Sequence, residues 1–327
     1  MYNITQEAGA AIAWTTGGTG TGQLHIKGNI SIAGTFAFTL ANGGGGIFFN
    51  GDATQTISGA GSGTTTITGA TTINSGSTLA TSRALTISTG LTINGSFQIN
   101  QGGWASGAGD FVYGVAGTLV FNNSSGFYGV PGDAKYWPVA SGPVNVTVQN
   151  TGGLQLETSR TVTGLFQTST GVRQSAPGND LTVSGTVRLN SGAFFENFSP
   201  MYSGSATLVY NTAGTYGVSN EWGAGTSVGY GVPQNVTIQN STTVTTPTTN
   251  RTAPGNITIS SGGLTLNGTS GDLSVGGNWS NSGTFTPNNR AVFFNGTGDQ
   301  SIGATTFDWL LINKASGAAS LGGSVTV

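Results

Sequence analysis

The chain has 327 residues, of which 57 are glycine and only 6% are charged. Nine Lys and Arg against eleven Asp and Glu leave a net charge of −2, which excludes both the broad basic surface of a nucleic-acid partner and the high net charge of a disordered protein. No apolar run is long enough for a membrane span, and the lack of cysteine excludes disulfides and cysteine metal sites. What remains is a folded, nearly uncharged β protein.

Short strand patterns follow one another along the chain, separated by corners of Gly, Asn and Ser. The clearest run is LTIS, LTIN and FQIN, whose first residues Leu85, Leu91 and Phe97 lie six positions apart. In each L-T-I triplet the two apolar residues share one face and threonine takes the other, as the two-residue period of a strand requires. Glycine interrupts every window long enough for a helix, so we expect only β structure.

Longer repeats divide the chain into four imperfect blocks. GTLVFNN at 117–123 returns as ATLVYNT at 206–212, and FFNG at 48–51 returns at 293–296. Aligning these motifs places one asparagine of each block in register: Asn50, Asn122, Asn211 and Asn295. A second motif follows each of them, as TTIN, NVTVQN, NVTIQN and LLIN. Such repeats are typical of solenoids, in which each repeat packs on its neighbours.

The pattern predicts an all-β fold, a parallel β-solenoid of about fifteen coils in four imperfect blocks, with roughly 18–25 residues in each coil. We expect residues 1–327 to form a single continuous rod. Low charge fits this fold, because stacked coils place equivalent residues above each other, where like charges repel and Thr, Ser and Asn form hydrogen-bonded ladders. The alternative is a string of immunoglobulin-like sandwiches, since the blocks repeat at 72–89 residues. The short strand steps and the absence of linkers disfavour it.

Two aromatic insertions, near 124–143 and 213–233, join the two motifs of the middle blocks. Each contains Tyr-Gly-Val, a tryptophan, further aromatic residues and a proline near its end. Long loops are usually functional, and exposed aromatic rings can stack on sugars or on a neighbouring subunit. The other interpretation is a lid that folds over the core of the same block. The candidate partner-contact residues are Tyr128, Tyr136, Trp137, Tyr216, Trp222 and Tyr230.

The fourth block carries a resemblance to a known group of proteins. GNWSNSGTF (277–285), VFFNGTGDQSIG (292–303) and LLINKASG (310–317) resemble the repeats of very large secreted bacterial surface proteins, common in Bacteroidetes-like lineages. These are broadly similar to filamentous-haemagglutinin-type adhesins. The resemblance implies a right-handed parallel β-helix displayed outside the cell, used for adhesion or as a structural fibre. It supplies no catalytic residues, and the plain repeat lacks the two aromatic insertions.

The titratable residues predict no reaction centre. No two of the eleven carboxylates lie closer than nine residues in sequence, whereas cleaving a polysaccharide requires carboxylates or a carboxylate and a base in one site. His25 alternates with Leu24 and Ile26, which places it on the outer face of a strand. The GxGxD-like runs at 107–110 and 296–299 are isolated, unlike the tandem repeats that bind calcium, so we interpret them as polar turns. We expect no catalytic, cofactor-binding or metal-binding residue.

One arginine recurs after the second motif of the first three blocks, as Arg83, Arg160 and Arg251. A single cation at one block position could contact an anion or a glycan, or it could cap the exposed carbonyls of a coil. Because each block has only one, capping is favoured.

The function expected from these features is that of a non-catalytic extracellular structural protein. We expect the self-assembling subunit or repeat segment of a bacterial surface filament, joined end to end to further copies by strand pairing. The candidate end-pairing residues are Ile4, Thr5, Val325 and Val327. The alternative is an adhesin rod that binds glycans or host or matrix surfaces through its lateral aromatic loops. A third class is a polysaccharide-degrading β-helix.

Overall fold

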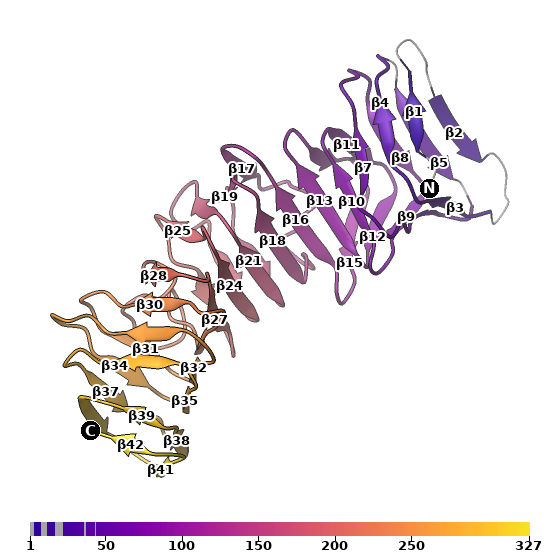
Figure 1. Cartoon of the computed structure of the whole chain (residues 1–327). Helices are drawn as coiled ribbons and strands as arrows, with labels where there is room; N and C mark the ends of the chain where they lie inside the picture. The colour runs from indigo at the N-terminus through magenta and orange to yellow at the C-terminus, as the bar shows by residue number, and fades with distance from the viewer. Residues whose placement is uncertain (1–2, 8–11, 17–21, 36, 43) are drawn as a thin grey trace. The chain divides into compact units, whose positions relative to one another are not determined.

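The computed structural model describes residues 3–7, 12–16, 22–35, 37–42 and 44–327. It is an all-β parallel β-solenoid of about 14 turns, as the sequence predicted. The strands pair in parallel, and the strands of successive coils lie side by side (Figure 1). Two isolated antiparallel bridges, Met201 with Tyr230 and Gly229 with Val232, lie at the second insertion. The alternative of immunoglobulin-like sandwiches is therefore wrong, because their strands pair antiparallel. The chain divides into two compact units, residues 1–160 and 161–327.

In the first unit, five coils contribute one strand to each of three ladders, and two further strands extend the first ladder. The first ladder consists of β1 (Ile4–Gln6), β4 (Ile30–Ile32), β7 (Gln55–Ser58), β10 (Thr78–Thr81), β13 (Ser96–Asn100), β16 (Thr118–Asn122) and β18 (Asn145–Gln149). The second consists of β2 (Ile12–Thr16), β5 (Phe38–Asn42), β8 (Thr65–Thr68), β11 (Ala84–Ile87) and β14 (Trp104–Ser106). The third consists of β3 (Leu24–Ile26), β6 (Ile47–Phe49), β9 (Ala70–Ile73), β12 (Gly90–Ile93) and β15 (Asp110–Tyr113). A separate ladder pairs β17 (Phe127–Val130) with β19 (Gly153–Leu156), and β20 (Arg160–Val162) follows.

The second unit repeats this plan. Its longest ladder consists of β21 (Leu165–Thr168), β24 (Thr186–Asn190), β27 (Thr207–Asn211), β29 (Asn235–Ile238), β32 (Ile257–Ile259), β35 (Trp279–Asn281), β38 (Gln300–Ile302) and β41 (Ala319–Leu321). Two four-stranded ladders consist of β28 (Thr215–Gly217), β30 (Thr243–Thr245), β33 (Gly263–Thr265) and β36 (Thr284–Thr286), and of β31 (Arg251–Ala253), β34 (Leu273–Val275), β37 (Ala291–Phe294) and β40 (Trp309–Ile312). The remaining pairs are β22 (Gly171–Gln174) with β25 (Phe194–Glu196), β23 (Leu181–Val183) with β26 (Met201–Tyr202), and β39 (Thr305–Thr306) with β42 (Val325–Thr326).

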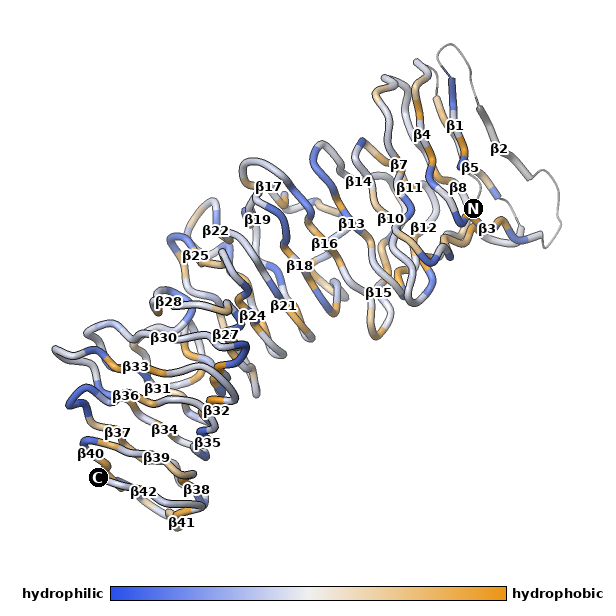
Figure 2. Tube along the Cα trace, in the orientation of Figure 1, coloured by the Kyte–Doolittle hydropathy of each residue, from blue (hydrophilic) through white to orange (hydrophobic). Residues whose placement is uncertain are grey.

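The core follows the two-residue alternation of the strands. Leu85 and Ile87 of β11 are buried, whereas Thr86 between them faces outward. Inward residues of successive coils stack in register, as in the pairing of Phe97 with Leu119, 22 positions later. Figure 2 shows hydrophobic residues recurring in the strands of successive coils. Each coil therefore covers the apolar face of the next, which provides the main stabilising term of the fold.

Uncharged polar side chains connect the coils at their corners. Asn122 donates from Nδ2 to Oδ1 of Asn100 over 2.8 Å, in the parallel register of β13 and β16. Of the four asparagines that the repeat alignment places in register, Asn122 and Asn211 end strands of one kind of ladder, whereas Asn50 and Asn295 follow strands of other ladders. In the second unit, Oδ1 of Asn256 accepts the backbone N–H of Asn278 at 2.7 Å, and Oδ1 of Asn278 accepts that of Ser301 at 2.8 Å. The predicted asparagine ladders are confirmed, and they repeat without accumulating charge.

Candidate functional site

The first aromatic insertion folds back onto the core of its own coil. The ring of Phe121 in β16 lies 5.3 Å from that of Tyr128, 6.4 Å from that of Tyr136 and 5.8 Å from that of Trp137. Tyr136 and Trp137 are buried, and the hydroxyl of Tyr113 donates to the backbone oxygen of Tyr136 at 2.5 Å. Side chains this deeply buried offer no surface to a partner. The lid alternative therefore describes Tyr136 and Trp137, while Tyr128 remains half-buried.

The second insertion is anchored by a buried tryptophan and a buried acid. Trp222 is fully buried and donates from Nε1 to the backbone oxygen of Thr252 at 2.9 Å. The neighbouring Glu221 is also fully buried, and its Oε1 accepts the hydroxyl of Tyr210 at 3.1 Å and the backbone N–H of Ser219 at 3.0 Å. Burial raises the pKa of the Glu221 carboxyl, and these hydrogen bonds offset part of that shift. Trp222 is thus also a lid residue rather than a contact.

The other two candidates of this insertion differ in exposure. Tyr216 is half-buried against Tyr210, with the ring centroids 5.3 Å apart, and burial raises the pKa of its hydroxyl. Tyr230 is 60% exposed, and its hydroxyl donates to Oδ2 of Asp180 at 2.6 Å. Of the six candidate contacts, Tyr230 offers the largest exposed fraction.

The recurring arginines cap coil carbonyls. Arg83 donates to four backbone oxygens of earlier coils, those of Ile32, Gly59, Gly61 and Gly63. Arg160 donates to the oxygen of Pro131 at 2.5 Å, and Arg251 to that of Asn250 at 2.9 Å. Burial lowers the pKa of all three guanidinium groups. The capping interpretation is confirmed.

Several carboxylates also serve corners of the coil. Asp272 accepts the backbone N–H of Ala291 at 3.0 Å, and Asp299, in the GxGxD-like run at 296–299, accepts that of Ala318 at 2.8 Å. Within the described residues, no three His, Asp or Glu side chains gather in a group that could hold a metal ion. His25 lies on the outer face of β3, as predicted, and stacks on Phe48 with the ring centroids 5.1 Å apart.

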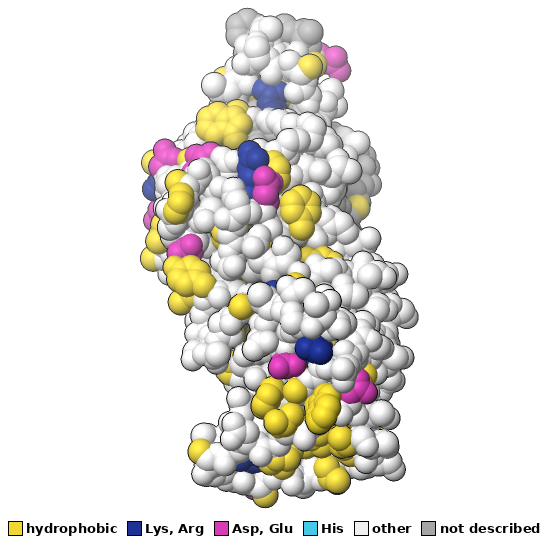
Figure 3. All heavy atoms as spheres, turned by 90° about the vertical axis from the view of Figure 1, so that its left-hand side faces the viewer, with side chains coloured by type: hydrophobic (Ala, Val, Ile, Leu, Met, Phe, Trp, Pro, Cys, Tyr) yellow, Lys and Arg dark blue, Asp and Glu magenta, His cyan; other side chains and the backbone are white. Residues whose placement is uncertain are grey.

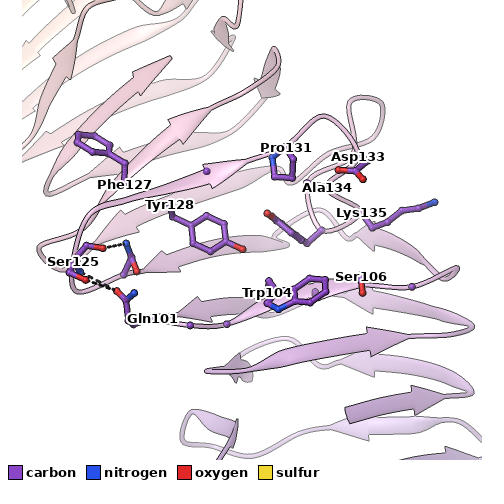
Figure 4. Close-up of a pocket in the computed structure, with 17 residues that line it drawn as sticks. Gln101, Trp104, Ser106, Ser125, Phe127, Tyr128, Pro131, Asp133, Ala134 and Lys135 are labelled. Carbon is purple, nitrogen blue, oxygen red and sulfur yellow. Dashed lines mark hydrogen bonds between the residues drawn. The ribbon is translucent and has the colours of Figure 1, made fainter. Parts of the chain in front are cut away.

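An open groove of about 710 Å³ lies on the flank of the first unit, between β14 and the segment from β17 to Tyr136. We call it the flank groove; its lining includes Gln101, Trp104, Ser106, Tyr128, Asp133 and Lys135. Figure 4 shows the side chains of Trp104 and Tyr128 reaching it from opposite strands. Trp104 is 50% exposed although it lies in a strand. Sequence reasoning missed it, because the WAS triplet has the alternation of an ordinary strand.

The last coil of the second unit leaves inward-facing residues uncovered. Ile312 pairs with Phe294, and Leu321 pairs with Ile302; both partners are fully buried, but Ile312 is 51% exposed and Leu321 63%. We call Ile312 and Leu321 the coil face. Figure 3 shows hydrophobic side chains gathered at the lower end of the view, over these coils.

The predicted end-pairing residues occupy different positions. Ile4 and Thr5 lie in β1, the end strand of its ladder, where they pair with Ile30 and Ser31. Val325 lies in β42 and pairs with Thr305, so one side of that strand is already paired. Val327 is exposed and lies beyond β42.

No protein-family model, curated protein or solved structure matches the chain. The described residues contain no helix long and apolar enough to cross a membrane. The repetitive parallel solenoid that the surface-protein resemblance implied is present, and no family is shown.

Proposed function

We propose that the chain is a non-catalytic structural protein, the subunit or repeat segment of an extracellular bacterial surface filament, in which solenoid coils stack end to end. The coil face carries the stacking in this proposal, and the extracellular bacterial setting rests on the resemblance of the repeats in the fourth block. The coil face consists of core-type residues in core-type register, and nothing in the described residues covers it.

Covering this face favours association. Fully burying a Leu or Ile side chain stabilises by about 1.5–3 kcal/mol, so covering the exposed halves of Ile312 and Leu321 contributes about 2 kcal/mol in total. β41 and β42 are the end strands of their ladders, so an added coil would also gain parallel backbone hydrogen bonds.

The occupant that fits the coil face is another coil of the same kind. Within the chain, the equivalent residues Phe294 and Ile302 are each covered by a following coil in parallel register. A further solenoid coil, from a second copy or from the next repeat, reproduces that contact without a new kind of interface. The corner roles of Asp272 and Asp299 support a structural rather than a catalytic use of the acids.

Sedimentation velocity at increasing protein concentration tests the stacking, together with negative-stain electron microscopy. We expect linear assemblies that grow with concentration and persist in high salt, because the contact is apolar and hydrogen-bonded. Ile312→Asp and Leu321→Asp should shift the distribution to the monomer. Leu311→Asp is the matched control, because Leu311 lies in the same strand but pairs with the outward-facing Phe293.

Proline in an end strand extends the test. Val325→Pro removes a backbone donor from the end strand β42 and should shorten the assemblies. Proline at Ile4 is a less direct test, because the N–H of Ile4 already donates to the backbone oxygen of Asn29 at 2.8 Å within the chain. Native protein that stays monomeric at the highest soluble concentration, or assemblies that Leu311→Asp disrupts as strongly as Ile312→Asp, would overturn the stacking proposal.

A further inference from the structure

The flank groove exists because the wall of the solenoid is interrupted there. β14 is the end strand of one ladder and β17 the end strand of the next, so no ladder joins them although they belong to successive coils. At this point the side chain of Gln101 provides the hydrogen bonds that a neighbouring strand would provide. Its Oε1 accepts the backbone N–H groups of Ser124 and Ser125, at 3.2 and 3.1 Å. A side chain thus satisfies the backbone where a strand would otherwise do so.

The interruption gives solvent access to an aromatic ring in a core position. Tyr128 pairs with the fully buried Leu154, yet Tyr128 is only half-buried because no strand of the preceding coil covers it. Trp104 lies at the opposite rim, on the outward face of β14, next to the inward-facing and buried Ala105. Two aromatic surfaces therefore border one hollow (Figure 4).

The corner that presents Trp104 is held by backbone geometry. A Cβ on Gly103 would lie 2.2 Å from the backbone oxygen of Thr81, so only glycine fits there. The position of Trp104 is thus fixed by the preceding coil and does not depend on a mobile loop.

Polar groups of balanced charge complete the lining. Gln101 and Ser125 lie toward one end of the groove and Asp133 and Lys135 toward the other (Figure 4). The lining carries one acid and one base, and the Nζ of Lys135 lies 3.9 Å from a carboxylate oxygen of Asp110. This arrangement offers hydrogen bonds without an excess of either charge, so it matches an uncharged ligand.

We propose that the flank groove binds a neutral oligosaccharide. The apolar face of a pyranose ring would lie against Trp104 and Tyr128, and its hydroxyl groups would exchange hydrogen bonds with Gln101, Ser106 and Asp133. The volume of about 710 Å³ falls within the range of small-molecule sites, and the groove is open, so a chain can extend beyond it. This site does not depend on end-to-end stacking, because the coil face belongs to other coils.

Isothermal titration calorimetry of the full chain with uncharged hexasaccharides tests the proposal. The probes are cellohexaose, laminarihexaose, mannohexaose and chitohexaose, with a hexagalacturonate and a six-residue Thr-Val peptide for comparison. We expect at least one neutral hexasaccharide to bind with a dissociation constant at or below about 1 mM. Trp104→Ala should weaken that binding at least tenfold, and Trp104→Phe should recover part of it.

Three control variants complete the test. Trp309→Ala removes a tryptophan of similar exposure in the second unit and should change the affinity less than twofold. Lys135→Ala should also have little effect, because the ligand carries no charge. Ile312→Asp, which should disrupt stacking, lies outside the groove and should leave the sugar affinity unchanged.

Three results would overturn the saccharide site. The first is the absence of heat with every neutral probe at about 10 mM. The second is binding that Trp104→Ala leaves intact. The third is preferential binding of the hexagalacturonate or the peptide, which would assign the groove to an anionic chain or to strand addition.

Discussion

Glu221 makes the second aromatic insertion sensitive to pH. Its carboxyl is fully buried, and the hydroxyl of Tyr202 also donates to the Glu221 backbone oxygen at 2.8 Å. Glu221→Ala leaves the Tyr210 hydroxyl and the Ser219 N–H without their acceptor. Each buried unsatisfied group costs about 1–3 kcal/mol, so the free energy of opening this insertion should fall by about 4 kcal/mol. Glu221→Gln keeps an acceptor oxygen and should cost about 1 kcal/mol at acid pH.

The sign of the pH dependence follows from the raised pKa. In the unfolded chain the carboxyl ionises near its ordinary value of about 4.3, whereas burial in the fold raises the pKa of Glu221. Between these two values the folded state holds more protons than the unfolded state, so the free energy of unfolding falls as the pH rises. Burial also raises the pKa of Tyr202, Tyr210 and Tyr216, and Arg251 stays charged, so none of these neighbours titrates in that window.

Hydrogen exchange of peptides from 213–233 measures this effect locally, because opening of one coil need not unfold the chain. From about pH 4 upward, after correction for the intrinsic exchange rate, the wild-type insertion should lose protection until Glu221 is ionised in the fold. In Glu221→Gln the protection of these peptides should not change over the same pH range. At neutral pH this variant should therefore be better protected than the wild type. Protection that rises with pH in the wild type, or a slope that survives in Glu221→Gln, would refute the reasoning.

Two further changes test the first unit. Phe121→Ala removes the ring on which Tyr128, Tyr136 and Trp137 pack, so it should cost about 3–5 kcal/mol and expose the first insertion to limited proteolysis; unchanged protease resistance would contradict the lid. Arg83→Ala should lower the free energy of unfolding in urea by about 1–2 kcal/mol, because coil carbonyls lose their donor. Arg83→Lys should recover only part of the loss, because an ammonium group lacks the planar fork of the guanidinium. Full recovery by Lys would show that charge alone acts there.

The fold could be predicted because its signals are local. The alternation in LTIS and LTIN assigns the inward residues. The asparagine alignment correctly relates Asn122 to Asn211, which end β16 and β27, but not Asn50 or Asn295, which follow strands of other ladders. The two insertions were also found, because extra length between two recurring motifs is visible in the sequence. Each of these inferences depends on residues that are neighbours in the chain or equivalent between repeats.

The sites could not be predicted to the same degree, because they depend on where a segment folds in three dimensions. Trp137 and Trp222 lie in loops whose aromatic composition is typical of contact loops, but both side chains are fully buried. No periodicity in the sequence indicates this burial. Trp104 is exposed because it faces outward from β14, and it borders a groove because the next coil does not continue its ladder, a feature that originates about twenty residues later in β17. Glu221 gave no signal, since a lone acid beside a tryptophan is ordinary at a surface.

The sparse charges of the chain explain why both proposed contacts are uncharged. Arg83 and Arg251 bond to coil carbonyls, and Asp272 and Asp299 accept backbone N–H groups, so these charged side chains are engaged at corners. A stacked fold places equivalent residues of successive coils next to each other, so a charge that recurs in every coil would lie beside a like charge and be repelled by it. The two proposed contacts therefore depend mainly on apolar area and hydrogen bonds, and the one acid and one base that line the flank groove, Asp133 and Lys135, balance each other. Both contacts should accordingly depend little on ionic strength.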